Sequence, residues 1–137
     1  EHFNQPNDVI TAPDGSIFVA DGHGGQSMLT PNNPTVTEGA TGRIMKFSAD
    51  GTFIKEWGQI GTEIGNFRTP HALEMDSEGR LFVADRGNHV IRKIVISTGA
   101  VTTIAGSAGS TGYTNATGTS ARFYRPIGMA IVGSNLM

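Results

Sequence analysis

The chain has 137 residues, a formal net charge of -2 and a sequence pI near 6.1. Proteins that bind nucleic acid usually present a basic face that releases counterions from phosphates, and ten Lys and Arg spread along this chain do not form a run. Since no apolar run approaches the roughly 20 residues that span a bilayer, we expect neither a nucleic-acid partner nor a membrane span.

Turn residues and short apolar runs predict eight β-strands in two similar units. With 19 Gly and 6 Pro in the chain, tight turns are favoured over long helices, and runs of four to six residues between turns are typical of antiparallel strands. In chain order we expect strands at Val9–Thr11, Ile17–Ala20, Arg43–Phe47, Phe53–Trp57, Ala72–Met75, Leu81–Ala84, His89–Val95 and Val101–Ala105. Trp57 ends an outer strand and is expected to pack between the units. The segments Gln26–Thr41 and Ser107–Ser120 are expected to be loops.

Three copies of a Phe-x-x-Pro start show that the sequence repeats. They begin at Phe3, Phe67 and Phe123, and the first two continue in register as far as Asp21 and Asp85. Four-stranded units at a fixed period are blades of a β-propeller. We therefore predict an all-β fold in which residues 1–137 form one partial propeller. The expected parts are a first blade at about 3–66, a second at about 67–122 and the start of a third, with strand Met129–Val132, at 123–137.

The repeated motifs resemble those of the NHL-repeat family. Both units contain Pro, then an Asp- or Glu-Gly turn, then Phe-Val-Ala-Asp, and Asn88-His-Val-Ile-Arg-Lys-Ile94 is similar to the third strand of that family. The first 90 or so residues resemble bacterial six-bladed propellers related to the peptidyl-α-hydroxyglycine amidating lyase. NHL propellers usually have five or six blades. The resemblance therefore implies that the chain is a fragment, which self-associates, pairs with missing blades or is marginally stable alone.

The resemblance also marks His71 as a candidate metal ligand. His71 follows Pro70 at the start of an innermost strand, and the corresponding histidine of the amidating lyases is one of three zinc ligands. The equivalent residues of the other copies, Asn7 and Ile127, do not complete such a shell. The alternative is a channel histidine bonded to water or backbone. If a cofactor is present, we expect zinc before calcium, because the alternating acidic spacing of a calcium loop is absent.

Arg86 and His23 are the candidate catalytic residues. Arg86 matches an arginine near the active site of the lyases, and its guanidinium suits a carboxylate or an oxyanion; the alternative is an ion pair with Asp85 or a neighbouring carboxylate. His23 stands where the lyases carry a catalytic tyrosine and is a candidate general base, with a solvated surface histidine as the alternative. Asp21 and Asp85 occupy the same place in both units. We interpret both as structural acceptors of backbone N–H groups in the following turn.

Two hypotheses of function remain open. The leading one is a scaffold that binds a protein, a peptide or a small ligand. The alternative is a zinc-dependent lyase or hydrolase that resembles the amidating lyase, with His71 on the metal. The number of channel histidines separates the two, and one histidine at the aligned positions favours binding over catalysis for this chain alone. The absence of cysteine leaves the compartment open, and our expectation is a periplasmic or secreted location.

Overall fold

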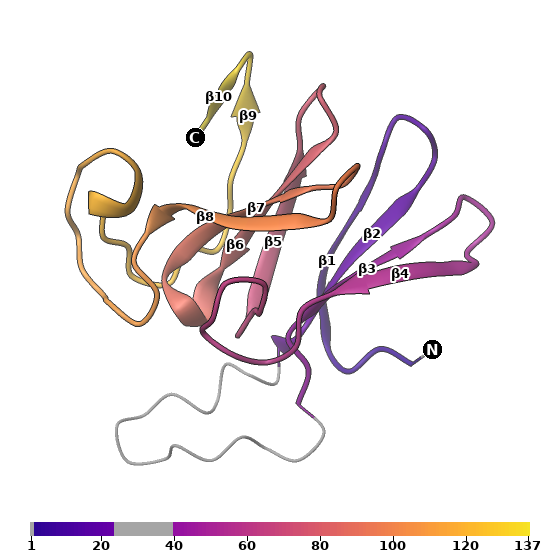
Figure 1. Ribbon diagram of the computed structural model, residues 1–137, viewed down its shortest axis with the longest axis horizontal. Coiled ribbons are helices and arrows are strands. Elements are labelled where there is room, and N and C mark those ends of the chain that lie inside the picture. The colour runs from indigo at the N-terminus through magenta and orange to yellow at the C-terminus, as the bar shows by residue number, and fades with distance from the viewer. Residues whose placement is uncertain (1, 24–39) are drawn as a thin grey trace.

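The computed structural model describes residues 2–23 and 40–137, and its main elements are two four-stranded antiparallel sheets (Figure 1). The strands of the first sheet are β1 (Pro6–Thr11), β2 (Ile17–Asp21), β3 (Arg43–Phe47) and β4 (Phe53–Trp57). Those of the second sheet are β5 (Pro70–Met75), β6 (Arg80–Asp85), β7 (Val90–Val95) and β8 (Ala100–Gly106). In each sheet every strand pairs with its neighbour in the sequence, as in a propeller blade. The predicted all-β fold is confirmed.

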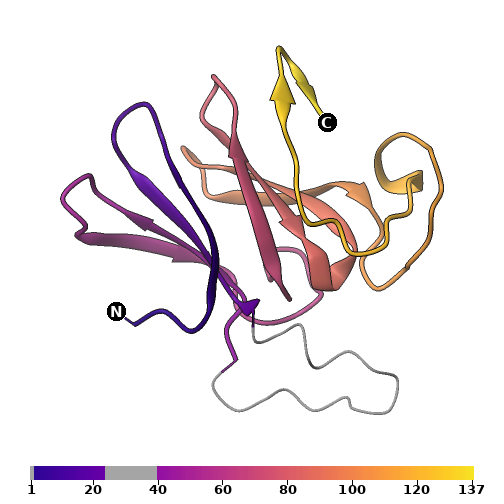
Figure 2. The ribbon, with the colours of Figure 1, turned by 180° about the vertical axis from the view of Figure 1, so that it is seen from behind.

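A short hairpin follows the second sheet. Here β9 (Ile131–Val132) pairs with β10 (Asn135–Leu136), so the expected strand Met129–Val132 is formed only by its last two residues. In both views β5 lies between this hairpin and the first sheet (Figure 2). The described segment 107–120 holds a 3₁₀ turn at Gly118–Ser120 and no strand, which agrees with the predicted loop. The other predicted loop, Gln26–Thr41, lies almost wholly outside the described residues.

The innermost strand of each sheet has a bulge at the same place. In β1 the pairing with β2 runs from Thr11 to Asp8 and resumes at Pro6, which leaves Asn7 without a partner. In β5 the same break falls at His71. A bulge adds one residue to a strand, bends it and re-aims the side chain of the extra residue. The two residues that the sequence repeat aligns are therefore also equivalent in backbone geometry, and both are turned away from the regular alternation of the strand.

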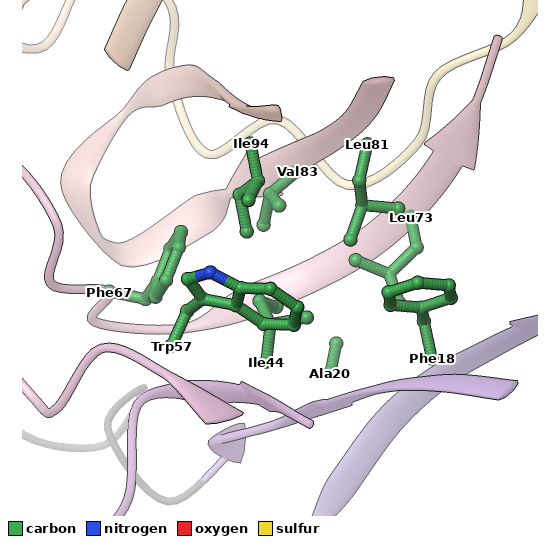
Figure 3. Packing of buried hydrophobic residues seen from close by; sticks show 9 residues of the cluster. All are labelled: Phe18, Ala20, Ile44, Trp57, Phe67, Leu73, Leu81, Val83 and Ile94. Carbon is green, nitrogen blue, oxygen red and sulfur yellow. The ribbon is translucent and has the colours of Figure 1, made fainter. Parts of the chain in front are cut away.

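One apolar cluster joins the two sheets (Figure 3). Its buried members come from both sheets and from the segment between them: Phe18, Ala20, Ile44, Trp57, Phe67, Leu73, Leu81, Val83 and Ile94. Trp57 is 7% exposed and stacks on Phe18 with the ring centroids 6.4 Å apart. The expected packing of this tryptophan between the units is confirmed. Burial of one large apolar side chain contributes about 1.5–3 kcal/mol, so this cluster stabilises the contact between the sheets.

A buried aspartate at the end of the second strand ties each sheet to the segment before its first strand. Asp21 Oδ1 accepts the N–H of Asn4 at 2.8 Å, and Asp85 Oδ1 accepts those of Arg68 and Thr69 at 2.9 and 3.1 Å. The predicted structural role is confirmed. The predicted partners in the following turn are wrong, because antiparallel pairing with the innermost strand places the preceding segment beside the carboxylate.

No helix in the described part of the chain is long and apolar enough to cross a membrane.

Candidate functional site

Two of the three candidate side chains lie next to each other. The imidazole rings of His23 and His71 have their centroids 6.0 Å apart, with an angle of 47° between the ring planes. His71 occupies the bulge of β5, and His23 follows shortly after the end of β2. The two sheets approach each other along β1 and β5 (Figure 1), so the pair forms where the innermost strands of neighbouring blades begin.

Asn7, the bulge residue of β1, orients His23. Its Nδ2 donates to the carbonyl oxygen of Pro70 at 2.8 Å. This bond turns Oδ1 of the same amide toward His23, where it contacts Nδ1 of the imidazole. Because an amide oxygen only accepts hydrogen bonds, Nδ1 of His23 carries the hydrogen, and Nε2 of the neutral ring keeps its lone pair.

His71 is oriented in the same way by the third repeat. Its Nδ1 lies 3.1 Å from the carbonyl oxygen of Ile127, and this nitrogen must also carry the hydrogen because a carbonyl only accepts. Ile127 is the residue that aligns with Asn7 and His71 in the Phe-x-x-Pro copies. The three aligned positions are thus linked in space. With Nδ1 committed to an oxygen, Nε2 of each imidazole is the nitrogen that can bind a metal ion or accept a proton.

These residues fit part of a zinc shell. A histidine that binds a metal usually donates its other ring N–H to a carbonyl or a carboxylate, as both histidines do to an amide or peptide oxygen here. A catalytic zinc has three protein ligands, and the described residues bring no three His, Cys, Asp or Glu side chains together. His71 and His23 would supply two ligands through Nε2. A third protein ligand has to come from outside the described residues.

Arg86 has a different environment from the two histidines. It begins the 3₁₀ turn Arg86–Asn88, and no hydrogen bond or ring contact joins it to either histidine in the described part of the chain. The alternative ion pair with Asp85 is not formed, because Asp85 Oδ2 instead lies 3.5 Å from Nε of Arg92. Burial lowers the pKa of Arg86, and the positive charge of Arg125 lowers it further.

Sequence reasoning did not assign a role to Asn7 or to Asp8. Asp8 Oδ2 accepts the backbone N–H of Leu73 at 2.8 Å and so bridges the two innermost strands. The signal in the sequence was the pair of polar residues directly after Pro6, where an innermost strand would be expected to begin with apolar alternation. Both residues join the blades, and Asn7 also holds a candidate site residue.

The stacked four-stranded antiparallel sheets, bulged at aligned positions of their innermost strands, define a segment of a β-propeller. Residues 67–94 match the family model of the NHL repeat. The second sheet therefore carries an NHL repeat, and the chain as a whole is similar to NHL-repeat propellers.

Relatives and a solved structure agree with this assignment. The chain is 39% identical over 105 residues to peptidyl-glycine alpha-amidating monooxygenase B of Xenopus laevis, a match over 72% of this chain and 10% of that protein. It is 34% identical over 97 residues to NHL repeat-containing protein 3 of Homo sapiens, over 71% of this chain and 24% of that protein. A crystal structure of a protein of unknown function from Bacteroides thetaiotaomicron shares the fold, with a TM-score of 0.67 at 18% identity over 88% of this chain and 28% of that one. The chain therefore spans between a tenth and a quarter of these two relatives.

Proposed function

We propose that this chain contributes blades to an NHL propeller that binds a peptide or a small ligand at Asn7, His23 and His71, which we call the rim site. The observation that supports this most is the meeting of the aligned repeat positions. Asn7 and His71 occupy equivalent bulges, and each donates a side-chain hydrogen bond to a carbonyl of the next repeat. Bulges are frequent next to binding and active sites because they re-aim side chains.

The chemistry of the rim site favours a ligand that donates hydrogen bonds. Each imidazole has its Nδ1 hydrogen committed to an oxygen, so Nε2 is the nitrogen that can act as an acceptor. Backbone N–H groups of a peptide, or the hydroxyl and amide groups of a small ligand, are matching donors. The ring centroids are 6.0 Å apart, which sets the separation of the two acceptors. A ligand whose donors have a matching spacing is therefore preferred.

The test is imidazole NMR of the full chain during titration with a panel of short peptides. A binding peptide is expected to shift the signals of His23 and His71 and to leave the signals of His2 in place. The variants His23→Ala and His71→Ala are each expected to weaken binding by about tenfold or more, the effect of one lost hydrogen bond of about 1.5 kcal/mol. His2→Ala is the matched control. Binding that neither variant weakens would refute the rim site.

A zinc-dependent lyase is the second candidate. It is favoured by the anchored Nδ1 of His71 together with the 39% identity to an amidating monooxygenase. A bound zinc supplies a Lewis acid that polarises a substrate oxygen. In this candidate His71 holds the metal through Nε2 and His23 is a second ligand or a general base. Arg86 binds a carboxylate or an oxyanion of the substrate.

Calorimetric titration with Zn²⁺ and an assay of peptidyl-α-hydroxyglycine cleavage separate the two candidates. A lyase predicts zinc binding that His71→Ala abolishes and turnover that a chelator removes. A metal-independent binding scaffold predicts that peptide affinity is unchanged by the chelator. Tight zinc binding without turnover assigns the metal to ligand binding or to structure and removes the lyase candidate.

A further inference from the structure

His89 lies among cations that the rim site does not use. Burial lowers the pKa of His89, and the positive charges of Arg125, Arg68 and Arg86 lower it further. Arg68 and Arg125 belong to the Phe-x-x-Pro starts of the second and third repeats, and Arg86 begins the turn after β6. We call these three residues the arginine cluster. The side chain of Arg68 lies against Gly87, next to Arg86, and the N–H of His89 donates to the carbonyl oxygen of Arg86 at 3.3 Å. The cluster draws on segments distant in the sequence, so the fold brings the charges together.

His89 and Arg125 are held against each other by an unusual backbone. The N–H of Arg125 donates to Nδ1 of His89 at 3.1 Å. His89 has φ 61° and Arg125 has φ 55°, left-handed conformations that residues other than glycine seldom adopt. Such conformations concentrate at binding and catalytic sites, where the surrounding structure maintains them. Because Nδ1 accepts a hydrogen bond, the neutral ring of His89 carries its hydrogen on Nε2, which becomes a donor.

Tyr124 fixes both side chains. Its ring stacks on the imidazole of His89 with centroids 5.9 Å apart and an angle of 16°, and the guanidinium of Arg125 lies 5.3 Å from the centre of the same ring. Tyr113 extends this group, with its ring 5.9 Å from that of Tyr124. A guanidinium held over an aromatic face keeps the N–H donors at its edge available.

No carboxylate neutralises Arg86 or Arg125 within the described part of the chain. The arginine ion pairs in the described residues involve other arginines, namely Arg43, Arg80 and Arg92. The charge of Asp85 acts on Arg68, but Oδ1 of Asp85 already accepts two backbone N–H groups and Oδ2 faces Arg92. Like charges held close together in a partly buried place repel each other, and a bound anion removes that repulsion.

We propose that the arginine cluster and Nε2–H of His89 form a binding site for an oxyanion, the carboxylate or the phosphate group of a small ligand. A guanidinium matches both groups through paired N–H donors. The partly buried setting strengthens the attraction relative to open water. This anion site joins the second blade to the third repeat. It shares no residue with Asn7, His23 and His71 and does not depend on ligand binding at the rim site; the lyase candidate also uses Arg86.

The test is titration of the full chain with inorganic phosphate and, separately, with acetate at constant ionic strength, followed by imidazole NMR. An anion that offsets the charges of Arg68, Arg86 and Arg125 is expected to move the titration midpoint of His89 to higher pH. The signals of His2 are expected to stay in place. Tighter binding of phosphate than of acetate assigns a phosphorylated ligand, and the reverse order assigns a carboxylate.

Two variants and a matched control complete the test. Arg86→Gln and Arg125→Gln are each expected to weaken anion binding by about tenfold or more. Gln5 occupies the position of Arg125 in the first repeat with φ 74°, so glutamine is compatible with the backbone there. Arg80→Gln removes an arginine that is paired with Asp76 outside the cluster and is expected to leave the affinity unchanged.

Either of two results would overturn the anion site. One is the absence of a saturable shift of His89 with both anions at millimolar concentration. The other is a loss of affinity in Arg80→Gln as large as that in Arg86→Gln, which would reduce the effect to net charge. If circular dichroism shows that Arg125→Gln does not fold, Arg86→Gln, at a half-buried side chain, decides the outcome.

Discussion

The rings of His23 and His71 lie with their centroids 6.0 Å apart, although one follows the second strand of the first sheet and the other lies in the first strand of the second sheet. Asn7 connects them, because its amide contacts Nδ1 of His23 and donates to the carbonyl of Pro70, the residue before His71. The pair is therefore a property of the junction between two blades, and ligand binding there depends on how the blades pack.

Asn7→Ala is expected to release the ring of His23. Without the amide oxygen, Nδ1 of His23 loses its acceptor, and the imidazole is expected to show a mixture of both neutral tautomers in place of one. The free energy of unfolding should fall by about 1 kcal/mol, the usual net value of one hydrogen bond. Nitrogen chemical shifts of the imidazole and chemical denaturation measure the two effects. Asn135→Ala, in the terminal hairpin, is the control, and an unchanged tautomer in Asn7→Ala would contradict the orienting role.

Asp85→Ala is expected to destabilise the second blade by about 3–5 kcal/mol, the cost of leaving one member of a buried ion pair alone. The side chain of Asp85 is 0% exposed and that of its partner Arg92 is 1% exposed. The variant also removes the acceptor of two backbone N–H groups. Asp21→Ala should cost less, since Arg43 keeps a second partner in Glu56. Urea denaturation of both variants gives the comparison, and equal losses would argue against the ion pair as the main cause.

Trp57→Ala is expected to weaken the contact between the blades. The indole is 7% exposed in the apolar cluster shared by both sheets, and truncation of a buried tryptophan costs about 3–5 kcal/mol. Ile54→Ala, on the same outer strand, removes a side chain that is 51% exposed and should change stability by about 0.5 kcal/mol or less. Thermal and chemical unfolding measure both. A small effect at Trp57 would mean that the sheets are held together elsewhere.

Asp50 is expected to make stability depend on pH in the acid range. The Ser48 hydroxyl and the backbone N–H of Thr52 donate to its carboxylate in the turn between β3 and β4, and they lower the pKa of Asp50 to about 2. A carboxyl whose folded pKa lies below its unfolded value of about 3.9 stabilises the fold above that value, and the contribution is lost as the pH falls through the folded pKa.

Asp50→Asn should therefore lose less stability than the parent chain between about pH 4 and pH 2. Melting temperatures recorded across this range make the comparison. A decline with falling pH as steep in Asp50→Asn as in the parent chain would show that other carboxyl groups dominate acid unfolding.

The sequence by itself determined the strands, the repeat and the structural aspartates, because each depends on short-range patterns. β3 and β4 lie at the predicted residues, since the turn at Asp50-Gly51 and the flanking apolar residues are local signals. Local signals mislead at His89, which was expected to begin a strand but has a left-handed backbone conformation. Its conformation accompanies the hydrogen bond from Arg125, a residue of the next repeat.

Only the tertiary structure decided which candidate residues meet. The sequence predicted unrelated roles for His23 and His71. The packing of the two sheets along β1 and β5 places their rings together. An ion pair with Asp85 or a neighbouring carboxylate was the alternative to a catalytic role for Arg86, but Asp85 faces Arg92, and Arg86 belongs to the cations around His89. The physical reason is common to these cases. Bulges re-aim side chains and blade packing sets their distances, and neither is encoded in the residues next to them in the chain.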